Sequence, residues 1–250
     1  MNIITLTREN LEKEHICCAI SNNNDCQVAS KKAWLAERFD DGLVFKKGDV
    51  RGKCFIEYIP AEKAWAPIDA DGYMYIDCLW VSGQFKGQGF STLLLDECIR
   101  DSKEKGKKGI VVLSAKKKMP FLSDPKYLEY KGFLKADSVQ PHYVLYYLPF
   151  DSSAEAPSFR ACVKCPEVKE NGFVLYYAHQ CPYTAKYVPI IEEIAKQRGV
   201  AFKSVLFKSC EQAQASPAPF TSYSLFHNGE FVTNEILSDK KFMKMLDELY

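Results

Sequence analysis

A glycine-bearing loop at residues 82–89 has the composition of a site for an anionic group. It reads Ser-Gly-Gln-Phe-Lys-Gly-Gln-Gly, follows a long apolar strand and precedes an amphipathic helix. Glycines let a backbone approach a ligand closely, and free N–H groups at a helix N-terminus attract negative charge. The Gln-x-x-Gly-x-Gly spacing differs from the glycine patterns of dinucleotide-binding folds and P-loops. The loop is therefore predicted to hold a pyrophosphate; the alternative is that its glycines only form a tight turn.

The elements that would position this loop alternate along residues 1–150. Helices mixed with strands favour α/β or α+β packing. Strands are expected near 2–6, 43–46, 52–59, 73–81, 109–115 and 143–149, and helices near 8–16, 29–40, 89–105 and 125–131.

The short helix at 125–131 has clear end signals. Asp124 is a good N-cap, and Pro125 suits the first helical turn. Gly132 is placed for a left-handed cap before Phe133. We therefore expect this helix to begin and end at defined residues.

Residues 84–89 resemble the acetyl-CoA pyrophosphate loop of the GNAT superfamily of N-acetyltransferases. The order of elements on both sides is also similar to that family, including the strand at 109–115 and the Tyr-Lys-Gly-Phe segment at 130–133, which a strand follows. The likeness covers about residues 1–150. It implies the GNAT fold, with a mixed, mostly antiparallel sheet that splays between strands 73–81 and 109–115.

The resemblance also implies where the cosubstrate acetyl-CoA binds. Pantetheine would enter the gap in the sheet beside residues 79–81, and the pyrophosphate would lie on the loop. The residues implied in binding are Leu79, Trp80, Val81, Gln84, Phe85, Lys86, Gly87, Gln88, Gly89, Phe90 and Ser91.

Direct attack of an amine on the thioester requires a base for the ammonium and an acid for the departing thiolate. Asp77 is the only carboxylate in strand 73–81 and is the candidate base; the alternative is a solvent-facing or paired strand residue. In many relatives a tyrosine stands four residues before the Gly-Phe pair, where this chain has Leu128. Tyr127 is the candidate acid if the helix is shifted by one residue; otherwise it packs. Aromatic candidates for an acceptor pocket are Trp65, Tyr73, Tyr75 and Trp80.

A polar stretch at 151–157 divides the chain. We predict an acetyltransferase domain at 1–150, a linker at 151–171 and a small domain at 172–250. In this small domain, strands are expected near 173–177, 200–207, 223–227 and 230–234. One helix is expected to end near residue 198, and another is expected to span 239–249.

This C-terminal order resembles a thioredoxin-like or glutaredoxin-like domain. Cys181-Pro182-Tyr183-Thr184 resembles a glutaredoxin motif whose second cysteine is replaced, and Pro219 is the candidate cis-proline. Joined to an acetyltransferase domain, it resembles the group of bacterial GNAT proteins with a YoaP-type C-terminal region.

Cys181 is the candidate redox residue. A thiol at a helix N-terminus is expected to have a lowered pKa. Cys162 and Cys165 have the spacing of two metal ligands, and His179 and Cys181 would have to supply the other two. Because His-x-Cys is an uncommon second half, no metal site is expected.

Charge and length exclude several classes of protein. The chain has 250 residues, with 33 basic and 32 acidic side chains and a net charge of +1, which argues against a nucleic-acid partner. Ten cysteines, several inside apolar runs, are typical of reduced thiols. Neither an export signal nor a membrane-spanning stretch is visible. A cytoplasmic location with no membrane partner is therefore expected.

The predicted function is acetyl-CoA-dependent N-acetyl transfer to a primary amine in a ternary complex. The acceptor, a small molecule or a peptide amine, is left open because acceptor loops vary within a fold. Two alternatives are a glutathione-linked thiol oxidoreductase centred on Cys181 and a non-catalytic acyl-CoA-binding sensor. An exposed edge strand could pair two chains into a homodimer.

Overall fold

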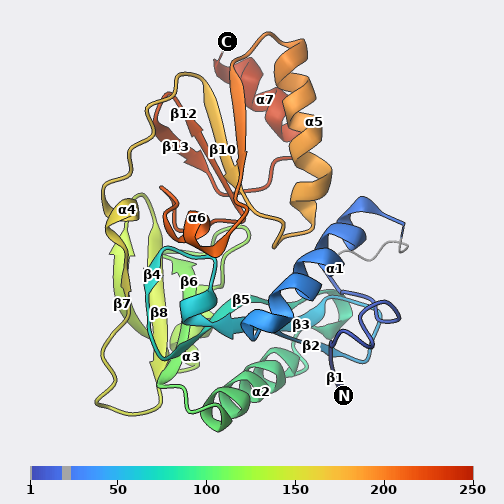
Figure 1. Cartoon of the computed structure of the whole chain (residues 1–250), viewed down its shortest axis with the longest axis vertical. Helices are drawn as coiled ribbons and strands as arrows, with labels where there is room; N and C mark the ends of the chain where they lie inside the picture. Colours follow the sequence, from blue (N-terminus) through green and yellow to red (C-terminus); the bar gives the residue numbers. More distant parts are fainter. Residues whose placement is uncertain (1, 19–23, 250) are drawn as a thin grey trace.

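Two sheets organise the computed structural model, which describes residues 2–18 and 24–249 (Figure 1). The larger sheet has the order β1-β2-β3-β5-β6-β8-β7, and the smaller has the order β11-β10-β12-β13. The larger comprises β1 (Ile3–Thr5), β2 (Val44–Gly48), β3 (Cys54–Pro60), β5 (Tyr73–Val81), β6 (Gly109–Ala115), β7 (Leu134–Val139) and β8 (Tyr143–Pro149). The smaller comprises β10 (Phe173–Tyr177), β11 (Phe202–Leu206), β12 (Tyr223–His227) and β13 (Glu230–Thr233).

The helices connect these strands, and the last helix follows β13. They are α1 (Cys26–Arg38), α2 (Phe90–Glu104), α3 (Pro125–Tyr130), α4 (Ala161–Lys164), α5 (Tyr183–Gln197), α6 (Cys210–Gln214) and α7 (Asp239–Leu249). Short 3-10 turns occur at η1 (Phe39–Asp41), η2 (Ala61–Lys63) and η3 (Gly83–Phe85). The expected α/β mixture is confirmed.

The seven-stranded sheet separates two apolar cores. Side chains alternate along β5, so Tyr73 and Tyr75 join one core while Met74 and Ile76 join the other. Helix α2 covers the second face with Leu94 and other apolar residues, and α1 lies on the first face with the C-terminal unit (Figure 1). Among the described strands of this seven-stranded sheet only β5 and β6 pair in parallel, which confirms a mixed, mostly antiparallel sheet.

The helix expected at 8–16 is wrong, because this segment forms hydrogen-bonded turns. The side chain of Asn10 accepts a hydrogen bond from the Thr7 N–H at 2.8 Å and donates to the Thr5 carbonyl at 2.9 Å. These bonds compete with the helical backbone pattern. Helix α1 begins three residues before the expected 29, since Asp25 accepts from the Gln27 N–H at 2.8 Å and caps it.

Short helix α3 has the expected ends. Asp124 accepts from the Lys126 N–H at 3.1 Å, and Gly132 has a φ of +83°. The Phe133 N–H donates to the Leu128 carbonyl at 3.0 Å, which closes the last turn. These caps fix the position of Tyr127 on the helix.

In the C-terminal unit β10 pairs in parallel with β11 and antiparallel with β12, and β13 completes the sheet. The strands and the long helices expected there are confirmed within a few residues, while α6 was not predicted. In the described chain the one cis peptide bond precedes Pro141, so a cis bond before Pro219 is wrong. The thioredoxin-like assignment stays a prediction.

Residues 151–171, expected as a linker, pack against the first unit. Strand β9 (Ser158–Phe159) pairs with β4 (Ile68–Asp69), and Phe159 is buried. Phe207 and Ala213 of the C-terminal unit join the same core as Phe159. The two units therefore share apolar contacts, while the domain boundaries stay a prediction.

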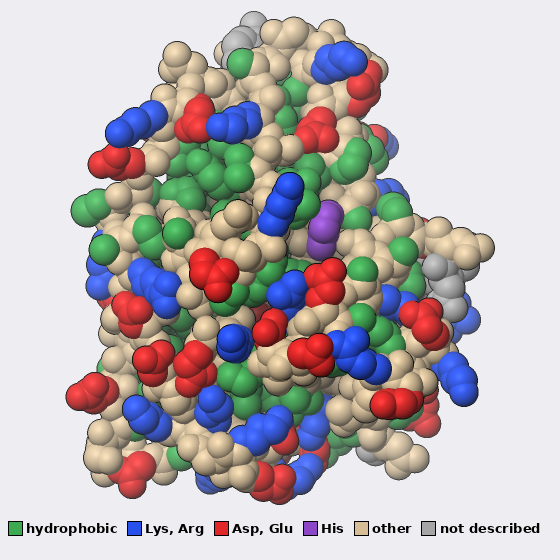
Figure 2. All heavy atoms as spheres, viewed as in Figure 1, with side chains coloured by type: hydrophobic (Ala, Val, Ile, Leu, Met, Phe, Trp, Pro, Cys, Tyr) green, Lys and Arg blue, Asp and Glu red, His purple; other side chains and the backbone are tan. Residues whose placement is uncertain are grey.

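The surface in the view of Figure 2 carries intermingled acidic and basic side chains, as the net charge of +1 leads one to expect. In the part of the chain that is described, no helix is long and apolar enough to cross a membrane.

Candidate functional site

Strands β5 and β6 separate near the middle of the sheet. Their pairing runs from Tyr73 and Gly109 to Ile76 and Val112 and then ends. Beyond that point β5 remains paired with β3 on its other side, up to Val81 opposite Cys54. The β6-facing backbone edge of β5 beside residues 79–81 is therefore left for another partner, and the expected splay is confirmed.

Asp77 lies at a bulge on β5. In the pairing with β3, Ile76 lies opposite Tyr58 and Cys78 lies opposite Glu57, so Asp77 is the extra residue. A bulge interrupts the alternation of side chains. Asp77 and Cys78 consequently both line the same cavity, although they are neighbours in the strand.

The loop after β5 presents unpaired backbone donors. The N–H groups of residues 87–92 donate to no group in residues 2–18 and 24–249. Gly87 and Gly89 have φ of +74° and +79°, and a Cβ on either would meet no described atom within 4 Å. These donors lie at the N-terminus of the 15-residue helix α2, where the helix dipole favours an anion.

Two contacts fix the shape of this loop. The Phe85 ring packs on Gly52, where an added Cβ would lie 2.3 Å from the ring. The Gln88 side-chain amide donates to the Gln84 carbonyl at 2.5 Å, and Lys86 is exposed beside them. These two contacts therefore fix the inner side of the loop. Its outer side, including Gly87 and Gly89, faces solvent.

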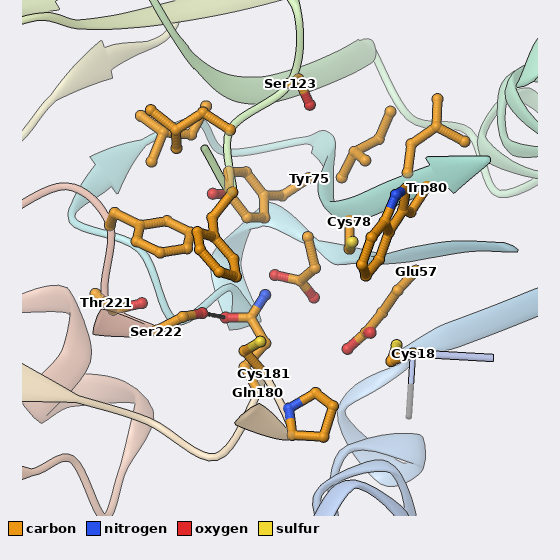
Figure 3. A pocket seen from close by; sticks show the side chains of 18 of the residues that line it. Cys18, Glu57, Tyr75, Cys78, Trp80, Ser123, Gln180, Cys181, Thr221 and Ser222 are labelled. Carbon is orange, nitrogen blue, oxygen red and sulfur yellow. Dashed lines mark hydrogen bonds between the residues drawn. The ribbon is translucent and has the colours of Figure 1, made fainter. Parts of the chain in front are cut away.

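A cavity of about 490 Å³ lies between the splayed strands and the C-terminal unit (Figure 3). The first unit contributes Asp77 to Trp80, the pair Lys31 and Glu57, and the loop 121–123. The C-terminal unit contributes residues 180–183 and 219–222. The Ser114 hydroxyl donates to the Ser123 carbonyl at 2.7 Å and holds the loop 121–123 at the cavity.

A buried ion pair lies in this cavity. The Lys31 ammonium donates to both Glu57 oxygens at 2.8 and 2.5 Å, and each side chain is 1% exposed. Trp34 donates from Nε1 to the same carboxylate at 3.3 Å. Burial lowers the pKa of Lys31, but Glu57 together with Cys18 and Asp77 outweighs this, and the pKa is raised. The ammonium therefore stays charged.

The carboxyl group of Asp77 has an altered proton affinity. Burial raises its pKa well above the ordinary value, Glu57 raises it further, and Lys31 and Gln180 act in the opposite direction. The Ser222 hydroxyl donates to the Gln180 Oε1 at 3.0 Å, which leaves the Gln180 amide N–H groups available to Asp77 (Figure 3). The C-terminal unit thus supplies the residue that faces this carboxyl.

Tyr127 lies apart from Asp77. It packs in the core on the α2 side of the sheet and is not among the residues that line the cavity. Its hydroxyl is buried and forms no hydrogen bond with the described residues. Burial raises its pKa, and Ser91 in the first turn of α2 opposes that change. The hydroxyl therefore stays protonated beside the end of the loop.

Cys181 lines the cavity, but the expected lowering of its pKa is wrong, while its redox role stays a prediction. Burial raises the pKa of this thiol to about 11, which outweighs the hydrogen bond from the Tyr183 backbone. Cys18 and Cys78 line the same cavity, and burial raises the pKa of both. Such thiols are weak nucleophiles near neutral pH. Among the described residues no three ligating side chains form a metal site.

Of the four aromatic candidates, Tyr75 and Trp80 line the cavity. Trp65 packs against Trp34 with ring centroids 4.7 Å apart, and Tyr73 donates to the Glu155 carbonyl at 2.7 Å. Lys53 lies 4.2 Å above the centre of the Trp80 ring.

Sequence reasoning missed Lys31, Glu57, Gln180 and Ser222. Lys31 and Glu57 are 26 positions apart, and Gln180 and Ser222 are 42 apart. A carboxylate inside the apolar strand 54–60 was the one signal for Glu57. The other three have ordinary surface patterns in the sequence.

Comparisons with known proteins match parts of this chain to two sequence families. The sequence model of the Acetyltransferase (GNAT) family matches residues 8–119, and the YoaP-like model matches residues 202–244. The protein named Uncharacterized N-acetyltransferase YoaP, from Bacillus subtilis strain 168, is 44% identical over 250 residues, which is 100% of both chains.

Solved structures show weaker likeness. A ribosomal-protein-alanine N-acetyltransferase from Brucella melitensis is 15% identical with a TM-score of 0.43, over 60% of this chain and 100% of its own. A GNAT family acetyltransferase from the same organism, in complex with acetyl-CoA, is 14% identical with a TM-score of 0.39, over 64% of this chain and 96% of its own.

Proposed function

The chain belongs to the GNAT family of acetyltransferases and carries a YoaP-like C-terminal region, and from this premise we propose that it transfers acetyl from acetyl-CoA to a primary amine in a ternary complex. The observation that carries the proposal is a continuous path. It runs from the free N–H groups of residues 87–92, along the open edge of β5, to the carboxyl of Asp77.

The loop and the first turn of α2 would hold the cosubstrate. The six free N–H groups suit a pyrophosphate, and the exposed Lys86 adds positive charge. The backbone of Leu79, Trp80 and Val81, unpaired toward β6, would accept the amide groups of pantetheine. We assign the same binding role to Gln84, Phe85, Gly87, Gln88, Gly89, Phe90 and Ser91, which form the loop and the helix start.

Asp77 is the proposed base and Tyr127 the proposed acid. Asp77 takes the proton of the ammonium, and the amine nitrogen then forms a bond to the thioester carbonyl carbon. The nitrogen of the tetrahedral adduct loses its second proton to water as the carbon–sulfur bond breaks, and the thiolate receives a proton from Tyr127. Asp77 and Tyr127 then return to their starting protonation states by exchange with solvent. The raised pKa of Asp77 makes it a stronger base, and the raised pKa of Tyr127 keeps its hydroxyl protonated.

Calorimetric titration of acetyl-CoA into the purified protein tests the binding site. We expect wild type to bind and Gly89→Glu to lose binding, since the new carboxylate would repel and obstruct the pyrophosphate. Gly199→Glu is the matched control, because Gly199 also has positive φ, +66°, and open space around it. A folded wild-type protein that does not bind acetyl-CoA would overturn the proposal.

An amine screen for CoA release then separates catalysis from the alternatives. Acetyl transfer should survive Cys181→Ser, whereas a thiol oxidoreductase would lose its activity in that variant. A protein that binds acetyl-CoA and releases CoA with no amine would act as a sensor, contrary to our proposal. The raised pKa of Cys181 speaks against the oxidoreductase.

We also propose a cytoplasmic location and the domain division at 1–150, 151–171 and 172–250. The ten free thiols suit a reducing compartment. A homodimer would use an outer strand of one of the sheets, such as β1 or β13.

A further inference from the structure

The C-terminal unit closes the cavity that holds Asp77. We propose that this unit forms the acceptor-selecting wall, and that the acceptor is a compact primary amine with one positive charge and an apolar body. This inference rests on the proposed acetyl transfer and deepens it. The inference is based on one cavity, which residues 180–183 and 219–222 of the C-terminal unit line opposite β5 (Figure 3).

Hydrogen bonds hold this wall in place. The Lys31 ammonium, already bound to Glu57, donates to the Gln180 carbonyl at 2.7 Å. The Thr221 hydroxyl donates to the Trp65 carbonyl, so both wall segments are tied to the first unit. Thr221 is buried, so this hydrogen bond lies away from solvent.

The charges in the cavity match a single ammonium group. Lys31, Glu57 and Asp77 are the charged residues among the described lining, and Lys31 and Glu57 neutralise each other. One carboxyl, Asp77, therefore remains for the acceptor. A second ammonium or a carboxylate on the acceptor would be buried without a charged partner, which is costly.

The rest of the described lining favours an apolar body. Aromatic rings enter from both units: Phe55, Tyr75, Trp80, Phe121 and Phe220. A volume of about 490 Å³ lies in the range of small-molecule sites, and it must also admit the end of pantetheine. Aliphatic or arylalkyl amines with a single ammonium match this lining, whereas aminoglycosides would bring several ammonium groups against one free carboxyl.

Gln180 links the wall to the chemistry as a positioning residue. Ser222 fixes the orientation of its amide by donating to Oε1, so its N–H groups face the Asp77 carboxyl. This arrangement would stabilise the carboxylate form of Asp77. We therefore expect Gln180→Leu to move the acidic limb of the kcat/KM profile to higher pH without changing acetyl-CoA binding.

Steady-state CoA release by the full-length protein tests the selectivity with matched amines. 2-Phenylethylamine is compared with phenylalanine, which adds one carboxylate, and hexylamine is compared with 1,6-diaminohexane, which adds one ammonium. We expect kcat/KM to be at least tenfold higher for the first member of each pair. Equal values, higher values for the second members, or no transfer to any of the four amines would overturn the inference.

The wall is tested by Phe220→Ala, with the exposed Lys240→Ala in the same unit as control. We expect a KM for 2-phenylethylamine raised at least tenfold in Phe220→Ala, with the KM for acetyl-CoA unchanged in both variants. An unchanged acceptor KM would overturn the role of the wall. If Phe220→Ala does not fold, the amine pairs on wild type decide. Loss of acetyl-CoA binding by wild type, in contrast, would mean that the proposed function itself has failed.

Discussion

At the scale of single residues, the position of Asp77 depends on one irregularity in β5. A regular strand would place Asp77 and Cys78 on opposite faces. The bulge opposite Glu57 and Tyr58 turns both toward the cavity. The same place lies near the buried pair Lys31 and Glu57, whose charges act on the pKa of Asp77. One extra residue in the strand thereby gives a carboxyl both access to the acceptor and an altered proton affinity.

The first prediction concerns Asp77→Asn. If Asp77 is the base, this variant should lose roughly 100- to 10,000-fold in kcat while binding acetyl-CoA as wild type does. In wild type the rate should rise with pH as Asp77 loses its proton, and this limb should lie above the ordinary pKa of 3.8 because burial raises the value. Initial rates across pH with calorimetry check both points. An unchanged kcat would remove Asp77 from the mechanism.

Sequence could identify Asp77 but not its surroundings. A lone carboxylate in an apolar strand can be recognised from the sequence alone. The glycine loop is also a pattern of neighbouring residues and can be recognised in the same way. Lys31 is different, because its surface-like residue type on a helix gives no sign that it is 1% exposed. Its partner, 26 positions away, becomes its neighbour only when α1 packs on the sheet.

At the scale of elements, ends marked by caps were predictable and packing contacts were not. The caps of α3, Asp124 and Gly132, lie where their residue types predicted. The helix expected at 8–16 failed because the side chain of Asn10 binds the backbone of Thr5 and Thr7, which precede it in the chain. Apolar periodicity alone could not reveal that competition.

The second prediction concerns the ion pair that joins α1 to β3. Lys31→Met leaves the Glu57 carboxylate buried and unpaired, so the free energy of unfolding should fall by about 3–5 kcal/mol. Lys31→Met with Glu57→Leu should recover much of this loss, because neither charge then remains. Urea unfolding of the single and double variants measures both.

The exposed pair Arg8 and Asp40 provides the control for this experiment. Its side chains are 51% and 81% exposed, so Arg8→Met should change stability by less than about 1 kcal/mol. A similar effect of Arg8→Met and Lys31→Met would contradict the assignment of a special cost to the buried pair.

At the scale of the whole molecule, the two units behave as parts of one site. The sequence indicated two units from a polar stretch at 151–157, and the C-terminal sheet confirms a separate set of strands. How the units dock depends on contacts such as that of Gln214, whose amide donates to the Ala64 carbonyl at 3.0 Å across 150 positions. No local pattern encodes such a contact, so the cavity wall could not be predicted.

Shared packing leads to the last prediction, that the two units unfold together. Phe159, Phe207 and Ala213 join the core that contains Trp34 and Trp65, so neither unit can open without exposing apolar surface of the other. All three tryptophans lie in residues 1–150, so their fluorescence follows the first unit. Hydrogen exchange of β10 follows the second. Both signals should change at the same urea concentration, and Gln214→Ala should lower both midpoints together. Two separated transitions would show that the units are independently stable and that the wall of the cavity can open without unfolding the sheet beneath it.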